Sequence, residues 1–136
     1  MPVVDPYSQY LENQLKTATP GKLLVMTFDA AIRFTRTAQT CMQQHKLDDQ
    51  NSNIRKVQNL LLELMKSINP TANPQLASNL DALYTYMFDR LTYANIHDNL
   101  PALEEVQGIL TDLRSTWADA ELSIRQSSEP AERVAA

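Results

Sequence analysis

The sequence predicts an all-α protein, an antiparallel up-down four-helix bundle with a short extra N-terminal helix or cap segment. Its 136 residues include only two glycines, which argues against a β-rich fold with many tight turns, and its long segments are rich in helix-forming residues. Four stretches repeat apolar residues at alternating spacings of three and four, and short polar segments connect them. Short connections between helices of similar length favour antiparallel neighbours.

Composition argues against several functional classes. We assign residues 1–126 to one domain, because a chain of this length builds a single core. The net charge of -4 gives no clustered basic surface for a nucleic acid. The N-terminus does not resemble a secretory signal, and no stretch reaches the roughly 18 apolar residues of a membrane span. We therefore expect a cytoplasmic protein with no nucleic-acid partner and no membrane insertion.

The N-terminal segment, residues 1–16, is expected to form a short helix or cap. Tyr7, Tyr10, Leu11 and Leu15 lie on one side of such a helix. A helix this short is not stable alone, so it must dock on the main body or on a partner. A permanently packed helix and a displaceable cap both fit this pattern.

The first long helix is expected at 20–44. Thr19 can cap it, and Pro20 can occupy the first helical position, where its missing N–H costs nothing. Its first half is apolar over most of the circumference and leaves only four clearly polar positions, Lys22, Thr27, Asp29 and Arg33. A helix of this kind is usually covered on several faces.

The second helix is expected at 51–68, after a polar connection rich in capping residues. It must end before residues 69–74, because two prolines there prevent the helix from continuing. Its main apolar stripe follows a 3-4-3-4 spacing through Ile54, Val57, Leu61, Leu64 and Ile68.

The third helix is expected at 74–95, with Asn73 as its cap and Pro74 at its first position. A fourth helix is expected at 100–125, where the 3-4-3-4 pattern recurs in Leu103, Val106, Leu110, Leu113 and Trp117. Residues 127–136 show no periodicity and are expected to form a flexible C-terminal tail.

The residues that enzymes and metal sites need are missing from suitable positions. A di-iron bundle requires Glu-x-x-His pairs, but His45 and His97 are preceded at that spacing by Met42 and Ala94. The two glycines stand apart, so there is no phosphate-binding loop, and no serine or cysteine has a recognisable nucleophile setting. We expect no catalytic residues, no metal and no cofactor, and hence no enzyme.

The chain has more apolar residues than one inward-facing stripe on each helix can bury. The first helix is apolar nearly all round, and the second contains a run of leucines at 60–62 beside its main stripe. In a bundle, leftover apolar faces form grooves, and grooves bind amphipathic helices or extended chains. The residues alone therefore indicate an interaction module without naming its partner.

Motifs in a fixed order along the chain resemble one family. They are Pro6 and Tyr7 with Tyr10; 17–26 followed by 28–29 and 31–34; Asn79, Leu80, Leu83, Tyr84, Tyr86, Met87, Arg90, Leu91, Ala94 and Asn95; and Glu105, Val106, Leu110, Leu113, Arg114 and Trp117. In these residues the chain resembles the flagellin-specific export chaperone family, the FliS type. Ala30 stands where that family commonly has glycine, and Thr27 stands where leucine is usual. At these two positions the helix packing and the affinity for a partner can differ from those of other members.

The resemblance implies an antiparallel bundle that binds the disordered C-terminal segment of flagellin in the cytoplasm. Binding in an apolar groove would prevent premature polymerisation and aid delivery to a flagellar type III export gate component, with no cofactor. We expect a monomer or weak homodimer; a self-associating structural or regulatory bundle without an export client is the alternative. The candidate flagellin-binding residues are Tyr7, Tyr10, Leu11, Ile54, Val57, Leu61, Tyr84 and Met87.

Overall fold

The computed structural model describes residues 6, 9 and 18–135, with side chains described up to residue 124. Its elements are α2 (Pro20–Gln43), α3 (Leu47–Lys66), α4 (Pro74–His97) and α5 (Leu100–Ala135). No residue of this described part is in a strand, so the predicted all-α class is confirmed. Apart from residues 6 and 9, the expected N-terminal cap segment lies outside the described residues.

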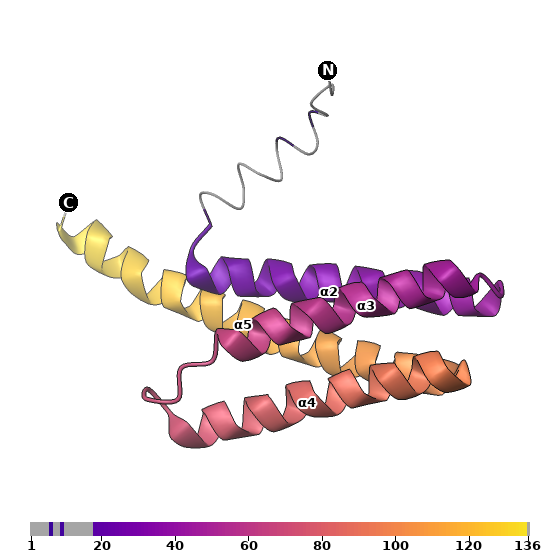
Figure 1. The fold of residues 1–136 in the computed structure, drawn as a ribbon. Helices are drawn as coiled ribbons and strands as arrows, with labels where there is room; N and C mark the ends of the chain where they lie inside the picture. The colour runs from indigo at the N-terminus through magenta and orange to yellow at the C-terminus, as the bar shows by residue number, and fades with distance from the viewer. Residues whose placement is uncertain (1–5, 7–8, 10–17, 136) are drawn as a thin grey trace.

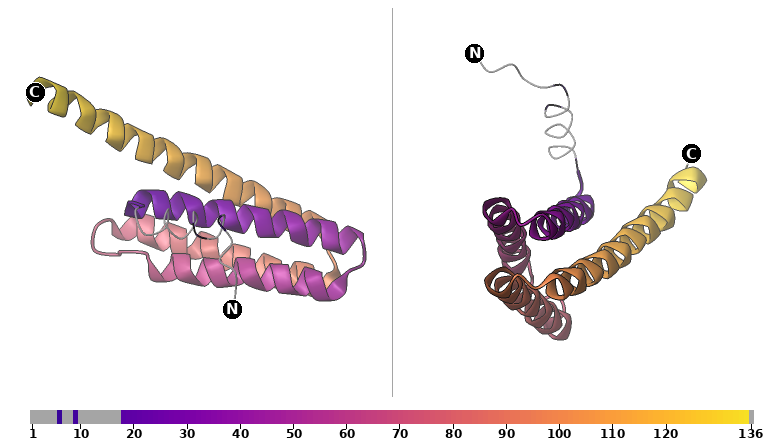
Figure 2. Two further views of the ribbon diagram at one scale, coloured as in Figure 1. Left: turned by 90° about the horizontal axis from the view of Figure 1, so that it is seen from above. Right: turned by 90° about the vertical axis from the view of Figure 1, so that its right-hand side faces the viewer.

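The four helices form a ring in which each packs mainly against two neighbours (Figures 1 and 2). α2 packs against α3 and α5, and α4 packs against the same two helices. Successive helices reverse direction at each short connection, which confirms the predicted up-down arrangement. The first and last of the four therefore lie side by side, and α2 makes the most extensive contacts in the bundle.

Side-chain caps set the starts of three helices. The Thr19 hydroxyl accepts a hydrogen bond from the Lys22 N–H at 3.2 Å, and the Asn73 side chain accepts one from the Leu76 N–H at 3.1 Å. Both caps precede a proline at the start of the helix, as expected. The Asn99 side chain likewise accepts a hydrogen bond from the Ala102 N–H at 2.9 Å, at the start of α5.

Two helix bounds differ clearly from the sequence-based expectation. α3 begins at Leu47, four residues earlier than expected, and has no side-chain cap; Asp48 and Asp49 in its first turn complement the positive end of the helix dipole instead. α5 continues to Ala135, whereas we expect an end at 125 and a tail from 127. It projects beyond the other helices (Figure 2).

The core is a continuous apolar cluster between the four helices. The expected inward stripes supply it, and α2 contributes one broad stripe that runs from Phe28 to Met42. Its fully buried large apolar side chains are Phe28, Ile54, Val57, Leu61, Met87, Leu91, Leu103, Val106 and Leu110. The residues that define the stripes by spacing therefore hold the bundle together.

Two adjacent leucines of α3 test this division between core and surface. Leu61 is fully buried and Leu62 is 42% exposed. We expect Leu61→Ala to lower the free energy of unfolding by about 2–5 kcal/mol, because it leaves a cavity, and Leu62→Ala to change it by about 0.5 kcal/mol. Urea unfolding followed by circular dichroism measures both. Equal losses in the two variants would contradict the arrangement of α3.

Candidate functional site

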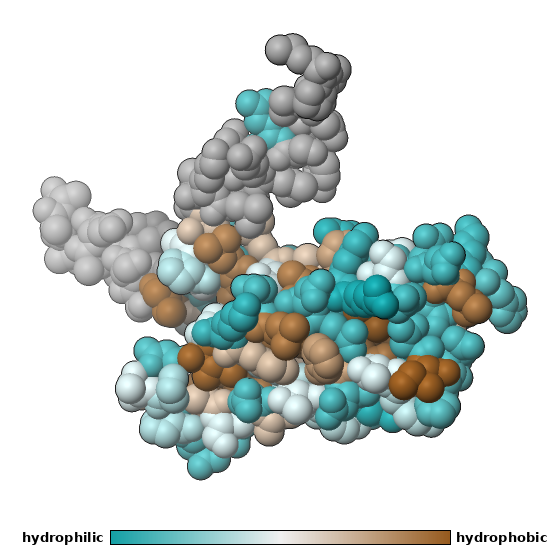
Figure 3. All heavy atoms as spheres, viewed as in Figure 1, coloured by the Kyte–Doolittle hydropathy of each residue, from teal (hydrophilic) through white to brown (hydrophobic). Residues whose placement is uncertain are grey.

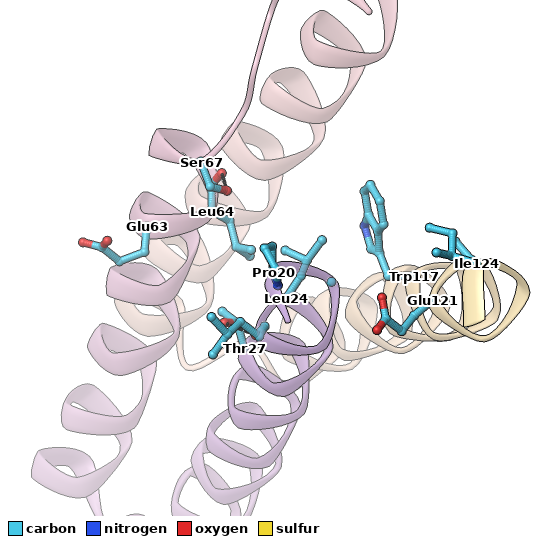
Figure 4. A pocket seen from close by; sticks show the side chains of 12 residues that line it. Pro20, Leu24, Thr27, Glu63, Leu64, Ser67, Trp117, Glu121 and Ile124 are labelled. Atoms are coloured by element: carbon cyan, nitrogen blue, oxygen red, sulfur yellow. Dashed lines mark hydrogen bonds between the residues drawn. The ribbon is translucent and has the colours of Figure 1, made fainter. Parts of the chain in front are cut away.

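An apolar cavity of about 520 Å³ lies at the end of the bundle where α2 begins and α3 ends. Its walls are the first two turns of α2, the last turns of α3 and the part of α5 that crosses this end (Figure 4). The apolar side chains that line it include Leu23, Leu24, Leu64, Trp117 and Ile124. Leu23 and Leu24 belong to the surplus apolar surface predicted for the first helix, whereas Leu64 and Trp117 belong to the main stripes of their own helices.

A second cavity of about 170 Å³ continues this hollow toward α4. Four residues line both cavities, and the second adds Leu76, Leu80 and Tyr84 of α4. We call the two joined cavities the end groove. Figure 3 shows hydrophobic residues gathered between α3 and α4 on a face that is otherwise largely hydrophilic. The groove therefore offers a preformed apolar surface built by all four helices.

The larger cavity has two charged residues among its described lining, and both are acidic. Glu63 comes from α3 and Glu121 from α5. The Thr19 hydroxyl donates a hydrogen bond to Glu121 Oε1 at 2.9 Å, and this bond links the α5 carboxylate to the N-cap residue of α2. A Cβ at Gly21 would overlap the Glu121 carboxylate as it is placed here, so a larger residue at position 21 would require this flexible side chain to move.

Four of the predicted binding residues lie in the core. Ile54, Val57, Leu61 and Met87 have no accessible surface, so in this conformation they support the groove and do not line it. Their contact with a client stays a prediction and would require the bundle to open.

One predicted residue lies at the groove. Tyr84 is 2% exposed and lines the cavity beside α4. Tyr7, Tyr10 and Leu11 lie outside the described residues.

Sequence reasoning missed the groove residues at the helix ends. The sequence pattern places Leu24 in an apolar helix and Trp117 in the periodic stripe of the fourth helix, and it does not single out Ile124. A signal for the last two exists, because Trp117, Glu121 and Ile124 are four and three residues apart and share one face of α5. The spacing alone does not show that this face of α5 is left uncovered because α3 ends at Lys66.

The described part of the chain contains no group of three or more His, Cys, Asp or Glu side chains arranged to hold a metal ion. None of the helices in the same part is long and apolar enough to cross a membrane. The end groove is a hydrophobic surface with two acidic residues, Glu63 and Glu121, in its lining.

A sequence model of the family described as "Flagellar protein FliS" matches residues 3–123. The chain belongs to the FliS family. The "Flagellar secretion chaperone FliS" of Bacillus subtilis (strain 168) is 36% identical over 126 residues, 93% of each chain. The protein of the same name from Escherichia coli (strain K12) is 27% identical over 121 residues, 88% of this chain and 89% of the relative.

A solved structure described as "Crystal structure of flagellar chaperone from bacteria" has the same fold. Its TM-score is 0.73 at 19% identity, and the match covers 87% of this chain and 99% of that one. The family resemblance inferred from the motifs is confirmed, and so is the helical bundle. The FliS assignment rests on residues that span nearly the whole described chain.

Tyr84 gives the groove wall a measurable pH dependence. Burial raises the pKa of Tyr84 from 10.0 to about 12. Because the folded-state pKa is the higher one, the stability linked to the protonated hydroxyl is complete below pH 10 and is lost as pH rises toward 12. We expect Tyr84→Phe to flatten the fall in unfolding free energy over this interval, as measured by urea unfolding. An unchanged slope would show that Tyr84 ionises as readily in the folded chain as in the unfolded chain.

Proposed function

We propose that this chain is a flagellar secretion chaperone that holds the disordered C-terminal segment of flagellin in the end groove. The observation on which the proposal depends is this apolar groove in a member of the FliS family. In the cytoplasm, the bound segment would be unavailable for polymerisation, and the complex would be the form that reaches the flagellar type III export apparatus. The relatives' name supports the class of function, and the groove supports the mode of binding.

The energetics favour a client segment rich in apolar residues. Ordering one residue of a disordered chain costs about 1–2 kcal/mol, while burying one large apolar side chain contributes about 1.5–3 kcal/mol. Two ordered residues thus cost about 2–4 kcal/mol, so a segment binds only if at least about every second residue places an apolar side chain in a groove that already exists. The leucines of α2, α3 and α4, together with Trp117, provide such a surface.

Covering a segment requires no chemical step. The chaperone acts as long as its client is bound, so neither a catalytic residue nor a cofactor has a role in this mechanism. Release depends on a competing surface, for which an export gate component is our proposed candidate.

The N-terminal segment 1–16 is proposed to cover part of the groove in the free protein. Pro20 and Gly21 line the larger cavity, so the chain before them joins the bundle at the groove itself. A short apolar segment tethered at this point competes with a client at high effective concentration. Tyr7, Tyr10 and Leu11 are its proposed contact residues.

A client titration tests the groove with a matched pair of variants on α5. Ile124 lines the larger cavity and is 66% exposed, whereas Leu122 is 52% exposed and does not line it. We expect Ile124→Asp to weaken binding of a flagellin C-terminal peptide by roughly tenfold, about 1.4 kcal/mol, because a charge replaces an apolar contact. Leu122→Asp should leave the affinity unchanged.

Fluorescence of Trp117, the only tryptophan, provides the signal in this titration. If the unmodified protein fails to bind the peptide at micromolar concentration, the proposed function is wrong. Sedimentation of such a protein as a stable dimer would support the self-associating alternative.

Amide hydrogen exchange tests the covering segment. We expect residues 3–15 to exchange faster when the flagellin peptide is bound, because the client displaces them from the groove. The measurement compares the free protein with the complex by mass spectrometry, with α3 peptides as the internal reference. Equal protection in both states would rule out a displaceable cap and leave a permanently packed or undocked segment.

A further inference from the structure

We propose that the Tyr84 hydroxyl is a hydrogen-bonding position inside the end groove, where it donates to a backbone carbonyl of the client. This inference rests on the proposed function and adds the chemistry of the partner: a segment whose backbone is not internally hydrogen-bonded where it enters the smaller cavity. The burial of Tyr84, its unpaired hydroxyl and the other polar groups of the lining support this assignment.

The Tyr84 hydroxyl forms no hydrogen bond with any described residue, although Tyr84 is 2% exposed. Burial is the cause that raises its pKa, and no hydrogen bond contributes to the shift. Buried tyrosine hydroxyls usually find a partner, because taking a hydroxyl out of water without a new hydrogen bond costs free energy. An unpaired hydroxyl at such a position therefore needs an explanation.

The unpaired hydroxyl remains accessible, and the hollow beside it is the smaller cavity. Within the described chain, Gln50 Oε1 is the one fully buried side-chain nitrogen or oxygen that has no hydrogen-bond partner. The Tyr84 oxygen is also unpaired, so it must keep part of its surface accessible. Tyr84 lines the cavity of about 170 Å³ together with apolar side chains such as Leu24, Leu80 and Trp117. A molecule that enters this cavity can therefore reach the hydroxyl.

The other polar side chains that line the smaller cavity already bind the protein's own backbone. The Ser67 hydroxyl donates a hydrogen bond to the Leu64 carbonyl at 2.8 Å. The side-chain oxygens of Asn69 and Asn73 accept hydrogen bonds from backbone N–H groups that follow them in the chain. Ser67, Asn69 and Asn73 are also exposed, so water reaches them. Among the described lining of this cavity, Tyr84 is thus the buried polar residue whose hydrogen-bonding group is unused.

A backbone carbonyl is a group that every residue of a client brings into the groove. An extended segment loses water from its carbonyls when it enters an apolar groove, and each carbonyl then needs a donor. A helical client already pairs its carbonyls internally, except in its last turn. The Tyr84 hydroxyl can donate to an unpaired carbonyl, and no charged residue of the described lining of this cavity competes for it. Tyr84 therefore favours a client that is extended, or ends a helix, at this cavity.

The experiment compares two tyrosines of α4 that lie two residues apart. Tyr84→Phe removes the buried hydroxyl and keeps the ring that packs in the core. Tyr86→Phe is the control, because Tyr86 is 45% exposed, lines neither cavity and donates a hydrogen bond to Glu105 Oε1 at 2.9 Å. The probe is the flagellin C-terminal peptide, and Trp117, which lines both cavities, reports its affinity by fluorescence.

A second measurement follows the hydroxyl in the unmodified protein and does not depend on the folding of a variant. Tyrosines that carry an NMR-active carbon isotope at Cζ report how fast their hydroxyl protons exchange, because the Cζ signal splits in mixed light and heavy water when exchange is slow. We expect the Tyr84 hydroxyl to exchange more slowly in the complex with the peptide than in the free protein. An exchange rate that is the same in both states would overturn the assignment.

We expect Tyr84→Phe to weaken peptide binding by roughly twofold to tenfold, the range of one neutral hydrogen bond, and Tyr86→Phe to leave it unchanged. Circular dichroism shows whether both variants are folded under the titration conditions. Equal affinity of Tyr84→Phe and the unmodified protein, or equal losses in the two variants, would overturn the role of Tyr84 while the proposed function stands. Failure of the unmodified protein to bind the peptide would overturn both.

Discussion

The need to cover the broad apolar face of α2 determines this bundle. The buried positions of α2, among them Phe28, Ala31 and Ile32, recur at spacings of three and four and form one face, which is too broad for a single neighbouring helix to cover. α3 and α5 supply that cover, and α4 closes the ring by packing against both. The Arg114 Nε–Asp29 Oδ1 contact at 2.9 Å adds a polar link between α5 and α2, but both groups are substantially exposed, so apolar packing is the larger contribution.

The groove follows from the same requirement. The apolar surface of α2 begins in its first turns, at Leu23 and Leu24, where the antiparallel α3 is about to end at Lys66. Too little protein remains at that end to cover these residues completely, and α5 passes over them with one face only. The result is an open apolar hollow within a well-packed bundle. A core built in this way leaves an apolar hollow at one end of the bundle while its centre stays closely packed.

The sequence was sufficient for the architecture because its strongest signals are local. Proline after a capping residue marked the starts of α2 and α4, and 3-4-3-4 spacing identified the buried stripes. The candidate binding residues could not be predicted in the same way, because Ile54, Val57 and Met87 have the same spacing whether their stripe faces a core or a groove. Which of the two it faces depends on where the neighbouring helices end. The start of α3 at Leu47 was not predicted either, because it lies in a polar stretch.

The contact between α2 and α5 has a consequence for how the protein is made. α2 leaves the ribosome early, but α5, one of its two main neighbours in space, is the last of the four helices to be made. At typical rates, synthesis from residue 20 to residue 124 takes roughly 5 to 20 s, and during this time the apolar surface of α2 lacks its final cover. The groove exists only once α5 has emerged, so a nascent chain has exposed leucines but no finished binding site. Emergence of α5 is thus the step that covers the apolar surface of α2 and completes the groove.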